Sequence, residues 1–457
     1  MADNKVVIVY GAGVSGRGAA QVLADRDQQV YLYNDNPCEI SSGLQQALKA
    51  NGGALAVGEA AYKELLGKAK LLVLSPGIAC DSANVQLALA QGLEVISEVE
   101  LGYRLYGGHI AAITGTNGKT TTTTIVGEMF KRLPVPSAVG GNIGLALSKE
   151  VEHLPKDAWL AAELSSFQLE RVNTFCPDIA VVLNLTPDHM ERHHTMKAYG
   201  EAKKNIFRQQ MSAQITVLNY DDTQVRAWGE QTKGQLCYFS RRKQLEQGIY
   251  MQDGNFIISW QGDRQVVCNI SELHLFGGHN EENILAAIAC GYFAGVSISD
   301  MADVLRNFRS IEHRIEYVTT IDGVPYYNDS KATNTDSTIK ALEAFADGHI
   351  ILLAGGHDKL TPLEPMMQLV KEKTDALILL GEAKERFNEA AVACGVQNII
   401  LVDSFEQAVQ KAHTMAHKPQ AVLLSPACSS YDMFKNYPER GNYFKKLVHA
   451  LEGGAKE

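Results

Sequence analysis

The chain has 457 residues, of which 46% are hydrophobic and 21% are charged, so it is too long for one ordinary core and we expect roughly two to four domains. Its 42 Lys and Arg against 52 Asp and Glu leave a formal net charge of −10, and without a basic block it is a poor candidate for binding nucleic acid. No apolar run approaches the roughly 18 residues that cross a bilayer, and no secretory signal precedes the first strand-like segment, so we expect no membrane insertion.

The 8 cysteines are scattered along the chain, and none forms a CxxC pair. A zinc site or a disulfide framework normally needs pairs or clusters of cysteines. The sequence therefore predicts reduced core thiols in a cytoplasmic protein.

Short apolar runs alternate with helical patterns along almost the whole chain, which is typical of α/β domains with parallel sheets. Three ligand-type loops lie far apart and predict three such domains. We place them at residues 1–97, 98–310 and 311–457.

The first domain opens with a strand that ends in a glycine-rich loop. Its strands are expected near residues 6–10, 30–33, 71–74 and 93–96. Residues 11–16 (GAGVSG) follow the first strand, and Asp35 follows the second. Such glycines allow a backbone to approach a diphosphate at a helix N-terminus, but they also serve turns used only for packing. The loop therefore indicates a Rossmann-like fold more firmly than a ligand.

The second domain contains the strongest motif in the chain, residues 113–120 (ITGTNGKT), after a strand at 109–113. In a phosphate-binding loop the amides hold phosphate oxygens, Lys119 supplies a charge and a Thr hydroxyl reaches magnesium. Ile113 stands where the standard motif has its first glycine, so this is a variant loop. A plain strand-to-helix turn rarely combines these residues.

Two polar positions follow the next strands, at 159–162 and 179–183. They are Glu163 and His189. A carboxylate at a strand end beside a phosphate loop suits magnesium. An isolated histidine is more often a satisfied residue, but this position favours a role for His189. We interpret His193 and His194 as solvated.

Further strands are expected at the end of the second domain and in the third domain. Residues 249–258 predict antiparallel strands joined at Asp253-Gly254. The third domain starts near residue 311, with strands expected near 324–327, 350–353, 376–380, 399–402 and 421–424.

On these motifs the chain resembles the Mur ligase family. The resemblance rests on residues 115–120 (GTNGKT), 163–168 (ELSSFQ), 184–189 (NLTPDH), 278–280 (GHN), 312–314 (EHR), 328–333 (NDSKAT) and 425–430 (SPACSS). Within the family it is most similar to the branch that adds D-glutamate, on residues 329–334 (DSKATN) and 431–437 (YDMFKNY). The DNPR-type motif of ligases that add a diamino acid is not visible.

Three other readings stay open at this point. A Mur-type ligase for another amino acid shares most of these motifs. A nicotinamide dehydrogenase would explain the loop at 11–16 but not the one at 115–120. A nucleotide-sensing protein without turnover would have no need to keep Lys119, Glu163, His189 and Lys203 together.

The resemblance implies a Rossmann-like domain that binds UDP, a central ATPase domain and a C-terminal dinucleotide-fold-like domain that brings the amino acid. The implied substrates are ATP, UDP-N-acetylmuramoyl-L-alanine and D-glutamate. ATP activates the second of these as an acyl phosphate, to which D-glutamate is then joined. The implied enzyme is a monomer with two magnesium sites. For ATP the implied residues are Gly115, Thr116, Asn117, Gly118, Lys119, Thr120, Thr121, Asn280, Asn283, Arg314 and Asp329. For the other substrates they are Ser15, Asp35, Ser75, Asn142, His189, Lys331, Thr333, Lys359, Ser430 and Tyr437.

The implied catalytic and metal-binding residues are Lys119, Thr120, Glu163, His189 and Lys203. Taken alone, Lys203 would be read as a solvated helix lysine. The family resemblance implies instead that Lys203 carries a carbamate, which turns a cation that repels magnesium into a pair of oxygen ligands.

Overall fold

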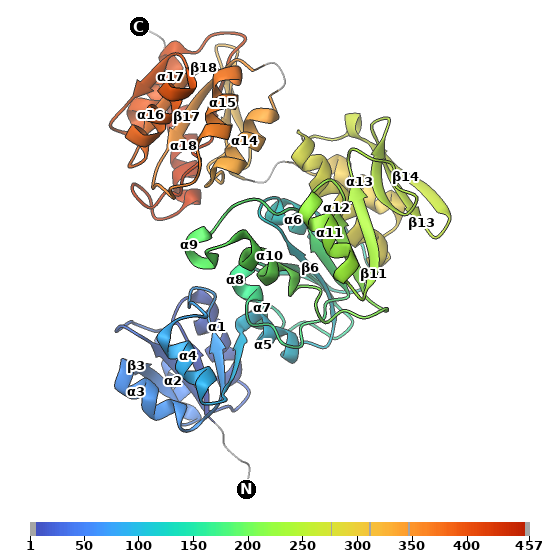
Figure 1. The fold of residues 1–457 in the computed structure, drawn as a ribbon, viewed down its shortest axis with the longest axis vertical. Helices are drawn as coiled ribbons and strands as arrows, with labels where there is room; N and C mark the ends of the chain where they lie inside the picture. The colour runs from blue at the N-terminus through green and yellow to red at the C-terminus, as the bar shows by residue number, and fades with distance from the viewer. Residues whose placement is uncertain (1–5, 276, 310–311, 346–347, 453–457) are drawn as a thin grey trace. The chain divides into compact units, whose positions relative to one another are not determined.

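Three β-sheets organise the chain in this computed structural model, which describes residues 6–275, 277–309, 312–345 and 348–452 (Figure 1). The chain divides into two units, one with residues 1–273 and 282–306 and one with residues 274–281 and 307–457. The first two sheets belong to the first unit and the third sheet to the second. The boundary expected at residues 310 and 311 lies outside the described residues.

The first sheet is parallel, with strand order β3-β2-β1-β4-β5. Its strands are β1 (Val6–Tyr10), β2 (Val30–Asn34), β3 (Ala54–Val57), β4 (Ala69–Leu74) and β5 (Glu94–Ser97). The helices between and after them are α1 (Val14–Ala24), α2 (Ser42–Ala50), α3 (Glu59–Leu66), α4 (Ala83–Ala90) and α5 (Glu98–Leu105). Every residue of β1 is buried, because hydrophobic clusters cover both faces of the sheet.

The second sheet has nine strands in the order β14-β13-β12-β11-β10-β9-β6-β8-β7. They are β6 (His109–Thr114), β7 (Ser137–Gly141), β8 (Trp159–Glu163), β9 (Ile179–Val182), β10 (Ile215–Asn219), β11 (Gln235–Ser240), β12 (Gly248–Gln252), β13 (Asn255–Trp260) and β14 (Asp263–Asn269). The strands from β7 to β12 pair in parallel, and β12, β13 and β14 pair antiparallel. The antiparallel strands expected at residues 249–258 are therefore confirmed.

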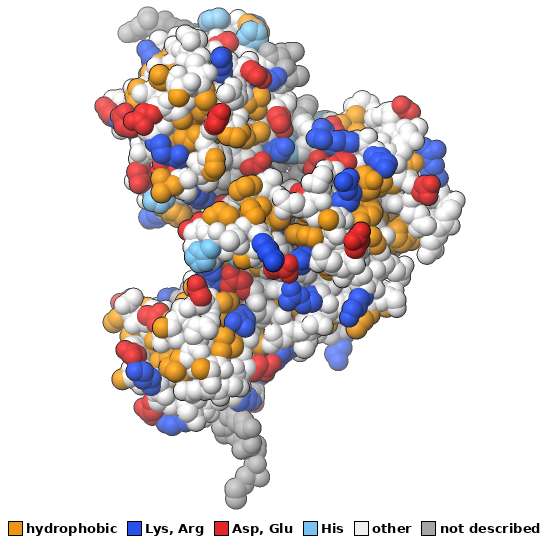
Figure 2. Space-filling view, viewed as in Figure 1, with side chains coloured by type: hydrophobic (Ala, Val, Ile, Leu, Met, Phe, Trp, Pro, Cys, Tyr) orange, Lys and Arg blue, Asp and Glu red, His pale blue; other side chains and the backbone are white. Residues whose placement is uncertain are grey.

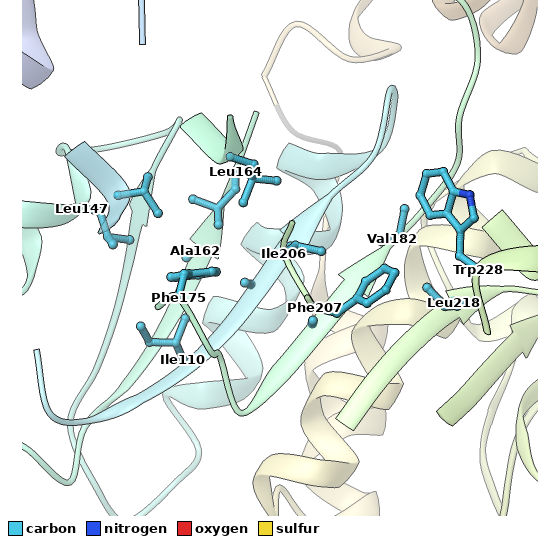
Figure 3. Packing of buried hydrophobic residues seen from close by; sticks show 14 of the residues in the cluster. Ile110, Leu147, Ala162, Leu164, Phe175, Val182, Ile206, Phe207, Leu218 and Trp228 are labelled. Atoms are coloured by element: carbon cyan, nitrogen blue, oxygen red, sulfur yellow. The ribbon is translucent and has the colours of Figure 1, made fainter. Parts of the chain in front are cut away.

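Helices join these strands and carry several of the candidate site residues. They are α6 (Lys119–Phe130), α7 (Leu147–Glu150), α8 (Ser166–Leu169), α9 (Met190–His193), α10 (Met196–Lys204), α11 (Thr223–Ala227), α12 (Gly278–Ala294) and α13 (Ile298–Asn307), with 3-10 turns at Trp228–Gln231 and Ile270–Glu272. Figure 3 shows the apolar cluster beneath them, which runs from Ile110 and Ala162 to Phe207 and Trp228. This packing fixes the strand ends from which the site loops leave.

The third sheet has the order β15-β16-β20-β17-β18-β19 and is parallel except for β15. Its strands are β15 (Glu316–Ile321), β16 (Val324–Asn328), β17 (Ile350–Gly355), β18 (Thr374–Leu380), β19 (Ile399–Leu401) and β20 (Ala421–Leu424). Its helices are α14 (Thr335–Glu343), α15 (Glu364–Lys373), α16 (Lys384–Cys394), α17 (Phe405–Met415) and α18 (Tyr437–Leu451). Residues of α14, α15 and α16 cover one face, and residues of α17 and α18 cover the other (Figure 1).

The surface of each sheet domain carries both signs of charge. On the face shown in Figure 2, Lys and Arg side chains are interspersed with Asp and Glu. Within the described ranges, no helix combines the length and the hydropathy needed to cross a membrane. All 8 cysteines are free thiols. The core position predicted for them is confirmed for four and wrong for the other four, which are partly exposed: Cys38, Cys80, Cys176 and Cys394.

Candidate active site

The loop between β6 and α6 can be built only with glycine at two positions. Gly118 has φ +84, and a Cβ there would lie 2.1 Å from Asn283 Oδ1. Gly115 has φ +157, and its Cβ would lie 2.9 Å from Leu183 Cβ. A side chain at either position would strain the backbone and clash with a neighbour. The loop therefore turns tightly into the N-terminus of α6, which is an arrangement that can hold phosphate.

Asn184, directly after β9, holds this loop in shape. Its Oδ1 accepts the N–H groups of Thr116 at 3.0 Å and Asn117 at 2.9 Å, and its Nδ2 donates to Asn117 O at 3.1 Å. The Thr116 hydroxyl donates to Thr186 O at 3.0 Å. Sequence reasoning quoted the segment around Asn184 but assigned it no role. The available signal was a side-chain amide at a strand end next to the phosphate loop.

Two lysines share one carbonyl oxygen of the loop. Lys119 Nζ donates to Gly115 O at 2.9 Å and to Thr116 O at 2.7 Å. Lys203 Nζ, from α10, donates to Gly115 O at 2.7 Å. Two ammonium groups on one oxygen would repel each other, so the charge of Lys119 disfavours protonation of Lys203.

Lys203 is buried, with only 1% of its surface exposed. Its Nζ lies 4.6 Å from the centre of the Tyr199 ring. Burial, followed by the charge of Lys119, lowers the pKa of the Lys203 amine well below its ordinary value. The interpretation of Lys203 as a solvated helix lysine is therefore wrong.

Glu163, the last residue of β8, is 2% exposed. Its Oε1 accepts a hydrogen bond from Asn142 Nδ2 at 2.8 Å, whereas its Oε2 is buried and has no partner among the described residues. A buried carboxylate oxygen without a donor is costly. A magnesium ion would satisfy it, and Thr120 lies buried in the first turn of α6 as a further hydroxyl.

His189 lies on the tight turn before α9, with φ +56. Its N–H donates to Asp188 Oδ1 at 2.9 Å, and its ring meets the Phe167 ring edge-on at 4.8 Å. The side chain is 37% exposed. No cluster of three His, Cys, Asp or Glu side chains forms a metal cage in the described part of the chain. Magnesium suits such a place, since it retains water and phosphate ligands.

His193 was interpreted as solvated, and this is wrong, because the residue is 7% exposed. Its Nε2 lies 2.9 Å from Ser166 Oγ, and its ring packs against Phe167 at 5.5 Å and Tyr199 at 5.1 Å. Burial lowers its pKa. His193 thus joins the loop after β8 to α9 and α10. His194 is exposed, as expected.

A cavity of about 510 Å³ lies between the glycine-rich loop of the first sheet and the loop after β7. Ser15, Ser75 and Asn142 all line it. Asp35 does not, because its carboxylate accepts hydrogen bonds from Tyr10, Tyr33 and Asn84. The full lining is Gly11, Ala12, Gly13, Val14, Ser15, Asn34, Ser75, Pro76, Gly77, Ile78, Gly141, Asn142, Gly144, Ala146 and Gln168.

Gly16 explains why this loop is so tight. A Cβ there would lie 1.8 Å from Gly11 O. The hydroxyl of Ser75 donates to the same oxygen at 2.7 Å. The loops after β1 and β4 are therefore tied together at the carboxyl edge of the sheet, where α/β folds bind ligands.

Asn280 and Asn283 lie about one turn apart on α12. Asn283 is 4% exposed, and its Oδ1 accepts the Thr122 hydroxyl at 3.4 Å. Because Gly118 also meets this oxygen, Asn283 lies against the phosphate loop.

The third sheet gathers the remaining candidate residues at its carboxyl edge. The strands β16, β20 and β17 are adjacent, and a loop leaves each of them at this edge. The loop after β16 carries Asp329, Lys331 and Thr333, the loop after β20 carries Ser430, and the loop after β17 carries Lys359; Tyr437 begins α18.

Arg440 ties two of these loops together, and sequence reasoning missed it. Its guanidinium is 1% exposed and donates to Ser330 Oγ at 2.9 Å, Ser330 O at 2.8 Å, Cys428 O at 3.1 Å and Ser429 O at 3.2 Å. Burial lowers its pKa to about 10. His357 N also donates to Ser429 O, at 2.9 Å, so the loop after β17 joins the same frame.

Asp329 is buried within this frame. Its Oδ2 accepts the Ser425 hydroxyl at 2.8 Å, and its Oδ1 accepts Ile315 N at 3.3 Å. Burial raises its pKa to about 7, although the Ser425 bond and the charge of Arg314 act in the opposite direction. The Nε of Arg314 is buried without a hydrogen-bond partner among the described residues.

Comparison with known protein families covers nearly the whole chain. The description "Mur ligase MurD-like, N-terminal domain" matches residues 4–97, "Mur ligase middle domain" matches residues 113–291, and "Mur ligase, glutamate ligase domain" matches residues 313–428.

Full-length relatives and solved structures agree with these matches. The chain is 42% identical over 453 residues to UDP-N-acetylmuramoylalanine--D-glutamate ligase of Pelotomaculum thermopropionicum, covering 99% of each chain. It is 42% identical over 456 residues to the protein of that name from Alkaliphilus metalliredigens, covering 98% of each. The structure of MurF from Acinetobacter baumannii has a TM-score of 0.63 at 17% identity, over 98% of this chain and 93% of that one. The MurF ligase of Thermotoga maritima in complex with ADP gives 0.59 at 16% identity, over 93% and 96%. The resemblance found in the sequence motifs is thus confirmed, and the chain belongs to the Mur ligase family.

Proposed function

We propose that the protein is an ATP-dependent ligase that joins D-glutamate to UDP-N-acetylmuramoyl-L-alanine in peptidoglycan precursor synthesis. The observation that carries the proposal is the 42% identity to ligases with this name along 99% of both chains. The phosphate loop of residues 115–120 supplies the chemistry that an ATP-dependent ligase needs.

The reaction must first activate a carboxylate, because a carboxylate is a poor electrophile for an amine in water. Transfer of the γ-phosphoryl group of ATP to the carboxylate of the L-alanyl residue gives an acyl phosphate, and the D-glutamate amine then displaces phosphate to form the amide. Phosphoryl transfer depends mainly on position and charge. Lys119 covers the β- and γ-phosphates in this proposal, by exchanging its two loop carbonyls for phosphate oxygens. Arg314, with its unpartnered buried Nε, adds charge at the same step.

Magnesium fits the residues at the end of β8. The unpartnered Oε2 of Glu163 and the hydroxyl of Thr120 are hard oxygen donors, and His189 lies on the turn after β9. When bound, the ion neutralises phosphate charge. In this proposal Glu163 and Thr120 would hold one ion and His189 would approach a second, and the ions would neutralise charge on the phosphates and the acceptor carboxylate.

We assign a carbamate on Lys203 as a ligand of the second ion. The support is the burial of a lysine whose Nζ is directed at the carbonyl of Gly115 and shares it with Lys119. A buried ammonium next to another cation is unfavourable. Reaction of the neutral amine with carbon dioxide replaces this repulsion by an anion with two oxygens, which suit magnesium.

The three sheets divide the substrates in this proposal. The cavity with Ser15, Ser75 and Asn142 takes the UDP-sugar, whereas Asp35 does not line this cavity. The adenine ring lies near Asn280 and Asn283. Residues at the edge of the third sheet take D-glutamate, namely Lys331, Thr333, Lys359, Ser430 and Tyr437, while Arg314 and Asp329 reach the nucleotide. The corresponding domains are residues 1–97, 98–310 and 311–457. A cytoplasmic monomer remains our expectation.

The function is tested by phosphate release from ATP in the presence of UDP-N-acetylmuramoyl-L-alanine and a panel of amino acids. D-Glutamate should be preferred over L-glutamate and D-aspartate, because a site that pairs both carboxylates leaves partners unsatisfied when length or hand is wrong. Equal turnover with L-alanine or with a diamino acid would reject this branch of the family in favour of another amino acid. Absence of any ATP-dependent release would reject the ligase itself.

A further inference from the structure

Asp358, in the turn after β17 and one residue before Lys359 in sequence, pairs with an arginine on α16 that no sequence motif indicated. Arg386, on α16, donates from Nε to Asp358 Oδ2 at 2.6 Å and from Nη2 to Asp358 Oδ1 at 2.6 Å. Its Nη1 donates to Thr361 O at 3.1 Å. One guanidinium therefore spans both oxygens of the carboxylate and the end of the turn.

Asp358 is an anion that Arg386 compensates. The Asp358 side chain is 12% exposed and that of Arg386 is 33% exposed. Burial by itself raises the pKa of Asp358, but the bonds from Arg386 and from Leu360 N at 2.9 Å outweigh it, and the pKa lies below its ordinary value. A bidentate pair of this kind is strong and geometrically specific.

Lys359 directly follows Asp358 in the chain. Within the described ranges it has no ion-pair partner. Leu360, the next residue, has φ +53 and is 78% exposed. This left-handed backbone is held by the bond from Leu360 N to Asp358 Oδ1. The turn is thus a built structure in which the carboxylate next to Lys359 is fully engaged by another cation.

We propose that Arg386 is a positioning residue that keeps Asp358 from neutralising Lys359, so that the charge of Lys359 remains available to a carboxylate of the amino acid substrate. This inference rests on the proposed function, which assigns Lys359 to D-glutamate. Arg386 does not touch the substrate. It acts because an uncompensated carboxylate one residue away would compete with the substrate carboxylate for the same ammonium.

The test is a set of variants with KM measured for each substrate. Arg386→Met keeps the aliphatic stem and should raise the KM for D-glutamate about 10- to 100-fold, the loss expected for one charge-assisted contact. The KM for ATP, the KM for the UDP-sugar and the kcat at saturating D-glutamate should stay unchanged. Asp358→Asn retains the acceptor for Leu360 N and should remain close to the unmodified protein. The double variant Asp358→Asn/Arg386→Met should recover much of the loss.

Lys384→Met is the matched control, because Lys384 lies on the same helix and pairs with the exposed Asp403 at 2.7 Å. It should leave every KM unchanged. Equal rises in all three KM values for Arg386→Met, or no rise for D-glutamate, would overturn the inference, as would a double variant no better than Arg386→Met. Lys359→Met tests the role of Lys359 in D-glutamate binding separately from the role of Arg386. If it leaves the KM for D-glutamate unchanged, the assignment of Lys359 is wrong, and the inference fails with it.

Discussion

The carboxyl edges of the second and third sheets both carry basic side chains, but of different kinds. At the phosphate loop, the amino groups of Lys119 and Lys203 donate hydrogen bonds to backbone carbonyls. At the third sheet, the guanidinium groups of Arg440 and Arg386 are locked into the frame by several bonds each. Lysine is a mobile point charge, whereas arginine is a rigid fork. The second sheet therefore holds charge that can move to a ligand, and the third holds charge that fixes loops.

The largest expected effect concerns Lys119, a mobile charge at the edge of the second sheet. Lys119→Ala should lower the turnover at least about 100-fold, since it removes one electrostatic donor from the transferring phosphoryl group. Turnover is measured by phosphate release at saturating substrates. Lys131→Ala is the control, because Lys131 caps the other end of α6 and pairs with the exposed Glu128. Near-normal turnover of folded Lys119→Ala would reject the phosphate-loop assignment.

Lys203 sharpens the comparison, because its charge is proposed to change sign. Lys203→Ala should lose about 10- to 100-fold in activity, a loss typical of groups that support a metal site, and acetate should restore part of it by supplying carboxylate oxygens. Lys203→Arg should stay poor, since its cation cannot take up carbon dioxide. The control is Lys204→Ala, whose Nζ bonds Gln231 at 2.8 Å. Full activity of Lys203→Arg would eliminate the carbamate.

The rigid arginine frame of the third sheet is expected to contribute to the stability of its unit. Arg440→Lys keeps the charge but cannot reach all four acceptors, so it should destabilise the third-sheet unit by about 1–3 kcal/mol through buried groups left unpaired. Faster hydrogen exchange at residues 328–333 and 428–430 is the measurement. Lys445→Met, on the same helix, removes ion pairs with Glu312 and Glu316. It should change exchange less, because the Lys445 side chain is 20% exposed whereas Arg440 is 1% exposed. Unchanged exchange in Arg440→Lys would show that the fork is dispensable.

A pH-dependent effect concerns Asp329, whose pKa is raised to about 7 by burial. The folded chain then keeps a proton that the unfolded chain releases, so this group stabilises the fold at low pH and the stabilisation is lost as the pH rises to about 7. The free energy of unfolding should fall by up to about 1.4 kcal/mol per pH unit across this window. Asp329→Asn should therefore gain stability relative to the unmodified protein between about pH 4 and 7 in calorimetry. Asp403→Asn, which removes an exposed carboxyl with a lowered pKa, should not show this gain.

The phosphate loop, the strand ends and the three-domain α/β architecture could be predicted because each depends on neighbouring residues. Gly115, Gly118 and Lys119 lie within five positions of the chain, directly after a buried strand. The strand cores at 350–353 and 421–424 show as continuous apolar runs, since both faces of a parallel sheet are covered. Short or polar strands such as β15, with its exposed Tyr317, offer no such run.

The cross-ties could not be predicted, because they join residues that are distant in the chain. Arg440 meets Ser330 across 110 positions, and Arg386 meets Asp358 across 28. Nothing near Arg440 distinguishes it from a surface residue until α18 is packed. His193 was misjudged for the same reason: four residues after His189 it looks solvated, but the partners that bury it, Ser166 and Phe167, come from an earlier strand end.

The burial of Lys203 has a consequence in time. A side chain that is 1% exposed meets dissolved carbon dioxide only when α10 and its surroundings open, so the rate of carbamate formation depends on how often this opening occurs. The carbamate would then form and dissociate at a rate that is independent of turnover. Enzyme kept in degassed buffer should start with a lag that bicarbonate shortens during preincubation but not when added with the substrates. The initial rate of the reaction would therefore depend on the carbon dioxide concentration during preincubation.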